Sequence, residues 1–97
     1  MANHRTELGA DFSEGARLLW VAAEDRAWSQ RRLGRELGAY EGEIMGVLYG
    51  DKRPRLEIVV AAERMLDVPS GAWLSKPLKA FVAPAARAQK QPARGAA

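Results

Sequence analysis

The first third of the chain carries hydrophobic residues at the spacing of one face of an α-helix. Ala16, Leu19, Trp20 and Ala23 recur at intervals of one, three and four residues, which places them on the same side of a helix. Ser13 stands just before this run, where a serine hydroxyl can cap the first backbone N–H groups. The pattern therefore predicts a helix over residues 13–26.

Three further segments show helical spacing, and turn-forming residues separate them. Glycines at positions 38 and 50 are expected to end the second and third segments in the left-handed conformation. Ser70 is expected to cap a final turn or two in which Trp73 and Leu74 anchor the core. The defining apolar positions are Leu33 and Leu37 in residues 30–37, Ile44, Val47 and Leu48 in residues 41–49, and Leu56, Val59, Val60 and Leu66 in residues 55–67.

The chain of 97 residues is 47% hydrophobic, which is enough for the core of one small domain. No stretch alternates like a strand, so the predicted fold is all-α with five short helices. We expect a flexible lead-in over residues 1–11, the helical domain over 12–76 and a packing or dimerisation segment over 77–83. From residue 84 onward there is no large apolar side chain, and a disordered basic tail is predicted.

The charge is distributed unevenly along the chain. Up to Asp67 there are ten basic and twelve acidic residues, whereas the remainder has five basic residues and no acidic one. A basic tail on a weakly acidic body is typical of a protein that meets a polyanion, although such a tail can also serve solubility alone.

The residue types available exclude most catalytic chemistry. The chain has no cysteine and a single histidine, His4, so thiolate, zinc–thiolate and multi-histidine sites lack their ligands. We therefore expect a protein that is not an enzyme and needs no cofactor or metal. The longest purely apolar run, residues 18–23, is far shorter than a membrane helix, and a cytoplasmic protein with no membrane contact is expected.

Residues 19–74 carry a motif with regular internal spacing. A Trp-Ser-Gln start at residues 28–30, a Leu-Gly turn at 37–38 and a Gly-x-Lys-Arg-Pro loop at 50–54 follow one another in register. This pattern resembles the Cro and phage-repressor class of helix-turn-helix proteins, the XRE family. Two short helices joined by so tight a turn must cross steeply, and Gly34 is best explained by a helix that crosses there.

The resemblance implies that the chain binds double-stranded DNA, with residues 41–49 entering the major groove as a transcriptional regulator of phage or prophage type. Phosphate contacts would come from the start of the second helix and from the loop after the third, and tail contacts from the basic C-terminus. The base-reading residues would be Tyr40, Glu41, Gly42, Glu43 and Gly46. The phosphate-contacting residues would be Ser29, Gln30, Arg31, Arg35, Lys52, Arg53 and Arg55, and those of the tail Arg87, Lys90 and Arg94.

The predicted reading helix departs from the family pattern. Relatives usually present serine, threonine, arginine, glutamine or asparagine here, whereas this chain has glycines and two glutamates, and Tyr40 and Arg55 replace the usual cap residues. A glutamate can still accept a hydrogen bond from cytosine N4. The alternative is a helix-turn-helix body reused as a protein-binding module for a host enzyme or polymerase. Leu48 and Tyr49 would then be either its contacts or simply core residues.

Two further sets of apolar residues have more than one interpretation. Trp20, Trp28 and Trp73 fall at helix-face or anchor positions, which favours core packing over stacking on bases. A set just after the domain either completes the core over the first helix or joins two copies in a homodimer, as in related repressors. Its members are Leu74, Leu78, Phe81 and Val82.

Overall fold

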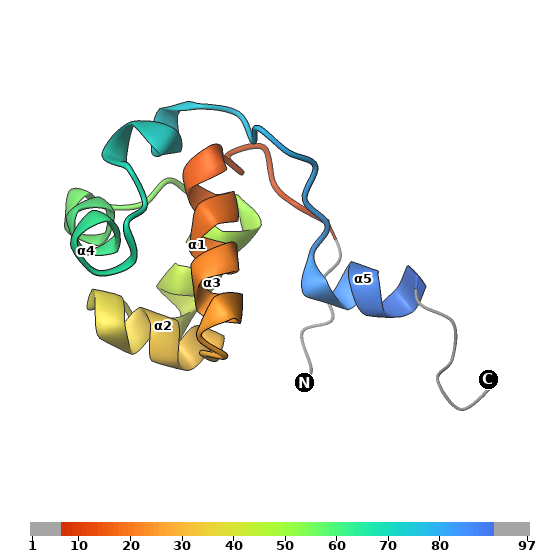
Figure 1. Cartoon of the computed structure of the whole chain (residues 1–97), viewed down its shortest axis with the longest axis horizontal. Helices are drawn as coiled ribbons and strands as arrows, with labels where there is room; N and C mark the ends of the chain where they lie inside the picture. Colours follow the sequence, from red (N-terminus) through yellow and green to blue (C-terminus); the bar gives the residue numbers. More distant parts are fainter. Residues whose placement is uncertain (1–6, 91–97) are drawn as a thin grey trace.

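The computed structural model describes residues 7–90, with side chains to residue 87, and this part contains five α-helices and one short 3-10 helix but no strand (Figure 1). The all-α fold predicted from the sequence is confirmed. In chain order the helices are α1 (Glu14–Asp25), α2 (Gln30–Leu37), α3 (Glu41–Tyr49), α4 (Leu56–Leu66), the 3-10 helix η1 (Ser70–Leu74) and α5 (Pro84–Lys90).

Side-chain and glycine caps set most helix boundaries where the sequence predicts them. Ser13 Oγ accepts a hydrogen bond from the Ala16 N–H at 3.1 Å, and Ser29 Oγ accepts one from the Arg32 N–H at 3.0 Å. Positions 38 and 50 end α2 and α3 with φ of 79° and 78°, which only glycine adopts without strain. Ser70 does not cap η1; Pro69 precedes that helix, with no side-chain cap.

The core lies among α1, α2, α3 and α4. Its fully buried large side chains come from all four helices and from the turn after α4; they are Leu19, Leu33, Ile44, Val47, Leu48, Ile58 and Val68. Trp20 packs edge-on against Tyr49, and its indole N–H donates to the Leu48 carbonyl at 2.7 Å. Trp20 and Trp73 are thus core residues. Leu74, which the sequence placed in the core, is instead 82% exposed, because only the Trp73 side of the short η1 faces α1.

Helices α2 and α3 cross closely at Gly34. A Cβ atom there would lie 2.7 Å from the Ala39 carbonyl oxygen and 3.3 Å from Ile44 Cγ2. The glycine inside α2 therefore has a packing reason, and the close crossing expected from the sequence is confirmed.

Both ends of the described chain are folded onto the helices. The Gly9 N–H donates to the Tyr49 carbonyl at 2.6 Å, and the Asp11 N–H donates to the Gly50 carbonyl at 2.8 Å. Residues 9–11 are therefore attached to the end of α3 and are not a flexible lead-in. The residues between η1 and α5, 75–83, form a segment that we call the strap; its Phe81 ring stacks on Phe12 with centroids 5.4 Å apart.

Helix α5 contradicts the prediction of disorder from residue 84. Pro84 occupies a first-turn position that suits proline, and the alanines after it have high helix propensity. Arg87 fixes the helix by donating to the Val82 carbonyl at 2.8 Å and by pairing with Glu24 on α1. The lack of large apolar residues predicted disorder here, although the local helix propensity of the segment is high. Arg94 lies outside the described residues, as does the side chain of Lys90.

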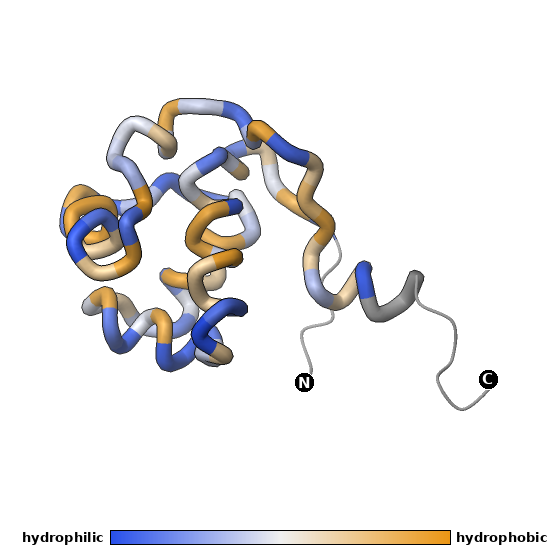
Figure 2. The backbone as a smooth tube through the Cα atoms, viewed as in Figure 1, coloured by the Kyte–Doolittle hydropathy of each residue, from blue (hydrophilic) through white to orange (hydrophobic). Residues whose placement is uncertain are grey.

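Hydrophobic and hydrophilic residues alternate along the helices of the described part (Figure 2). Among residues 7–90, no helix combines the length and the apolar character that crossing a membrane requires. Helices α4 and α5 lie on opposite sides of α1 (Figure 1).

Candidate functional site

The two ends of α3 differ in exposure. Its last turn is core, since Val47, Leu48 and Tyr49 are all buried. Its first turn faces outward: Tyr40, the residue before the helix, is 69% exposed, and Glu41 is exposed too. The crossing with α2 thus presents the N-terminal end of α3 at the surface.

Of the five residues predicted to read bases, three lie on this exposed edge: Tyr40, Glu41 and Gly42. A Cβ atom on Gly42 would lie 3.1 Å from Tyr40 Cε2, so the tyrosine ring rests against the first turn of α3 at the position of this glycine. Tyr40 also makes no side-chain cap hydrogen bond. The exposed edge is therefore an aromatic ring beside a carboxylate.

The other two predicted base-reading residues do not face outward. Glu43 is only 7% exposed, and Gly46 is buried under the side chain of Lys52, whose Cε would lie 3.0 Å from a Cβ placed on that glycine. The expectation that both are outward positions was wrong, because α3 turns these residues toward α4 and the loop that follows α3. The unusual arginine at position 55 is the one feature of the sequence that points to the burial of Glu43.

The start of α2 carries the first group of predicted phosphate contacts. Arg31 is highly exposed, and its Nε lies 3.6 Å from Glu41 Oε1. Arg35 is exposed without an ion-pair partner among the described side chains. Arg32, which is also exposed, lies over the Trp28 ring with its Cζ 4.8 Å from the ring centroid. Ser29 caps the helix and Gln30 begins it, so both lie at the helix end where backbone N–H groups lack helical partners.

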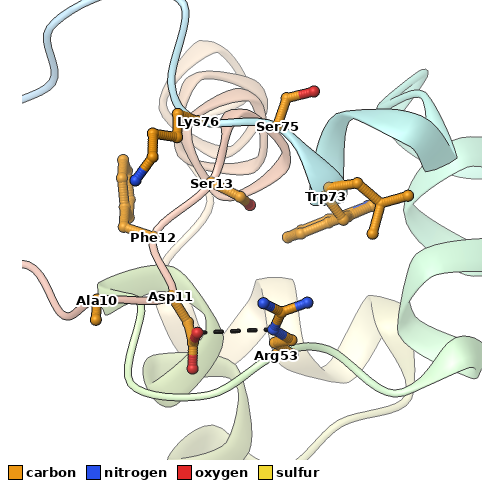
Figure 3. Close-up of a pocket in the computed structure, with 9 residues that line it drawn as sticks. Ala10, Asp11, Phe12, Ser13, Arg53, Trp73, Ser75 and Lys76 are labelled. Carbon is orange, nitrogen blue, oxygen red and sulfur yellow. Dashed lines mark ion pairs between the residues drawn. The ribbon is translucent and has the colours of Figure 1, made fainter.

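The loop after α3 carries the second group of predicted phosphate contacts. Lys52 and Arg53 are exposed, and Arg53 Nε lies 3.6 Å from Asp11 Oδ1. Figure 3 shows this pair at one side of a pocket, with Lys76 on the other side. The N-terminal segment therefore contributes an acidic partner to the loop that the sequence alone did not reveal.

Arg55 is the third predicted phosphate contact after α3, and its side chain already pairs with another side chain of the protein. Its guanidinium donates to both carboxylate oxygens of Glu43, with Nη2 3.1 Å from Oε1. These hydrogen bonds hold the pKa of Glu43 below its usual value, against the opposing effect of burial, and raise the pKa of Arg55. Glu43 is therefore ionised at neutral pH and paired.

Both acidic residues of the first turn of α3 are thus next to an arginine. Glu41 is paired with Arg31 from α2, and Glu43 with Arg55 from the start of α4. Acidic side chains also suit the positive end of a helix dipole. The repulsion of a phosphate backbone that two bare carboxylates would cause is reduced by these pairs.

The four apolar residues that follow the predicted domain form one half-buried pair and one exposed pair. Phe81 and Val82 are half-buried, and Phe81 lies 5.8 Å from the Trp20 ring, so this part completes the core over α1. Leu74 and Leu78 remain exposed, at 82% and 77%. Arg87, predicted as a tail contact for nucleic acid, is paired with Glu24 and lies over Phe81.

Comparison of the chain with protein-family models, with curated proteins and with solved structures finds no match. Among the described residues, no three histidine, cysteine or acidic side chains are grouped as metal ligands would be. What is established is a small, compact, all-helical domain.

Proposed function

We propose that this domain is a non-enzymatic transcriptional regulator of the helix-turn-helix type that binds duplex DNA. The observation that carries the proposal is the exposed first turn of α3, which lies beside Arg31 of α2 and is followed along the chain by exposed Lys52 and Arg53 in the loop after the helix. Cations before and after a protruding helix suit contact with the phosphate backbones that border a major groove about 12 Å wide.

The proposed contacts are fewer than the sequence suggested. Phosphates meet the N-terminus of α2, where Ser29 and Gln30 lie, together with the side chains of Arg31 and Arg53. Base edges meet Tyr40 and Glu41, whose carboxylate accepts from a cytosine amino group. Because Glu41 is paired with Arg31, the arginine must be shared with a phosphate when the complex forms.

The homodimer in this proposal relies on exposed Leu74 and Leu78, because Phe81 and Val82 already pack over α1. Lys76 and Lys79 flank the two leucines, and α4 carries exposed Leu56 and Val60 beside Glu57 and Glu63. Apolar surfaces edged with opposite charges suit contact between the strap of one copy and α4 of a second. Dependence of the sedimentation coefficient on protein concentration, and its loss in Leu78→Glu, would support this contact.

The experiment is a selection of bound sequences from random duplex DNA, followed by titrations at several salt concentrations. Arg31→Glu and Arg53→Glu should each weaken binding to all duplexes and lower the slope of log K against log salt by about 0.9. Arg64→Glu, the same change on an exposed arginine in the last turn of α4, is the matched control and should leave the slope unchanged.

The reading edge is tested by Glu41→Ala. We expect a loss of about 1–3 kcal/mol on the selected site, relaxed choice at one base pair, and non-specific binding that is equal or stronger because a negative charge has gone. Absence of binding to every duplex would contradict the proposal and favour the alternative, a protein-binding module. That module could use exposed Tyr40 but not Leu48 and Tyr49, which are core residues.

A further inference from the structure

One arginine joins three elements around the exposed end of α3. Arg55 stands directly before α4 and makes no cap hydrogen bond there. Its guanidinium instead reaches back to both carboxylate oxygens of Glu43 in the first turn of α3. It also lies 3.4 Å from the Gly38 carbonyl in the α2–α3 turn and 3.5 Å from a carboxylate oxygen of Glu57 in α4.

This arginine links α3 directly to the start of α4. Helix α3 packs mainly on α2 and α1, and α4 packs on α2, η1 and α1, with little contact between α3 and α4 themselves. Glu43 is nearly buried, so leaving its carboxylate without a partner would be costly. A planar guanidinium that donates two parallel hydrogen bonds fixes direction as well as distance, which a lysine cannot do.

We infer that Arg55 and Glu43 form a clamp that positions the first turn of α3 for binding, and that neither residue contacts DNA. This inference rests on the proposed function and deepens it, since it assigns two of the expected contact residues a positioning role. The half of Arg55 that remains exposed is consistent with a side chain that lies along the protein surface between the two helices.

The DNA-binding arm of the test measures three clamp variants, which are Glu43→Gln, Arg55→Gln and the double variant of these two. The control is Arg53→Gln, which changes an exposed arginine two residues away. Each clamp variant should lower the ratio of specific to non-specific affinity about tenfold, and the double variant should lose no more than either single one. The non-specific salt slope should stay unchanged in Arg55→Gln but fall by about 0.9 in Arg53→Gln.

Glu43→Gln separates the two roles of Arg55 by the sign of its effect. If Arg55 were a phosphate contact, removing its carboxylate partner would release it and strengthen binding to the selected site. A clamp predicts weaker binding to that site instead. Stronger specific binding by Glu43→Gln, or a lower salt slope in Arg55→Gln, would overturn the inference.

The second arm uses the free protein and so does not depend on DNA binding. Amide hydrogen exchange at Ile44, Met45 and Gly46 should accelerate in both clamp variants, while the amides of Leu19 and Ala23 in α1 keep their rates. Equal acceleration in both helices would mean general destabilisation and would overturn the clamp. If the wild type binds no duplex, the proposed function fails, but this arm still decides whether Arg55 positions α3.

Arg55→Lys keeps the charge and serves as the variant with the smallest risk to folding. It should retain a cooperative thermal transition and still show faster exchange in α3 and a reduced specificity ratio. Full recovery of both properties by lysine would show that charge alone matters and would contradict a clamp that works by paired hydrogen bonds.

Discussion

Two carboxylates near the starts of helices, Glu14 and Glu43, are buried and each receives two hydrogen bonds from one arginine, yet they serve different regions. Glu14 pairs with Arg17 one turn later on α1, with Nε 2.8 Å from Oε1, and it also accepts from the Leu78 N–H at 2.7 Å. Glu43 pairs with Arg55 across two elements. One pair attaches the strap to α1, and the other links α3 to α4.

The two pairs differ in how closely their surroundings are packed. Next to Glu14, Gly15 is covered by the Trp73 ring so closely that a Cβ atom has no room. Next to Glu43, Gly42 is exposed, and only the Tyr40 ring lies near it. The α1–strap region is closed by packing, whereas the start of α3 is held by ion pairs and left open to solvent.

The two glycines provide the largest expected contrast. Gly15→Ala should destabilise the fold by about 1–3 kcal/mol or more, because the Trp73 ring is packed between α1 and η1 and must shift. Gly42→Ala should instead stabilise by up to about 1 kcal/mol, because alanine favours the helix and an exposed tyrosine ring can move aside. Urea unfolding followed by circular dichroism measures both. Equal destabilisation by the two changes would mean that the Tyr40 ring is as fixed as Trp73.

The second-largest effect on stability is expected where the strap meets Glu14. Glu14→Ala removes the acceptor of the Leu78 N–H and should cost about 1–3 kcal/mol, whereas Glu14→Gln keeps an oxygen at that position and should cost less. Hydrogen exchange at the Leu78 amide should rise in Glu14→Ala and stay slow in Glu43→Ala. A Leu78 amide that exchanges rapidly in the wild type would show that the strap is not held by Glu14.

The comparison also shows where sequence reasoning succeeds. The bounds of α2 and α3 follow from Leu33, Leu37 and Ile44 at helical spacing and from glycines that end each helix, because these are local properties of the chain. The Glu14–Arg17 pair has the spacing of neighbours on one helix face. The buried tryptophans follow from their positions in the same periodic pattern.

What the sequence missed depends on contacts between distant residues. The resemblance to helix-turn-helix proteins placed Glu43 on the outward face of α3, and only the arginine twelve residues later makes its burial acceptable. Leu74 was assigned to the core from its residue type, although η1 is too short to bury both it and Trp73. The helix at residues 84–90 has local propensity in its proline and alanines, but the ion pair of Arg87 with Glu24 on α1 is a contact that no local pattern indicates.

Acid should weaken both pairs. The hydrogen bonds from Arg17 and Arg55 hold the pKa of Glu14 and of Glu43 below the ordinary value of 4.5. A carboxylate with a lowered pKa in the fold adds stability that is fully present above its unfolded pKa and is lost as the pH falls through the folded one. Stability should therefore be constant near neutrality and decrease below about pH 4.5. Glu14→Gln and Glu43→Gln should each flatten this decrease; a profile unchanged in both variants would contradict the pairing.

The smallest expected effect concerns Arg87, which lies on the α1–strap side of the molecule and was predicted from sequence as a nucleic-acid contact. Because its guanidinium already pairs with Glu24 and lies over the Phe81 ring, Arg87→Ala should lower the stability by about 0.2–1 kcal/mol, as expected for an exposed pair. The slope of log K against log salt for DNA should not change. A chain ending at residue 90, which lacks Arg94, is the matched comparison and should lose at most about one unit of slope. If Arg87→Ala alone lowers the slope by about 0.9, the arginine leaves Glu24 to bind phosphate, and the division into a binding region and a purely structural one is wrong.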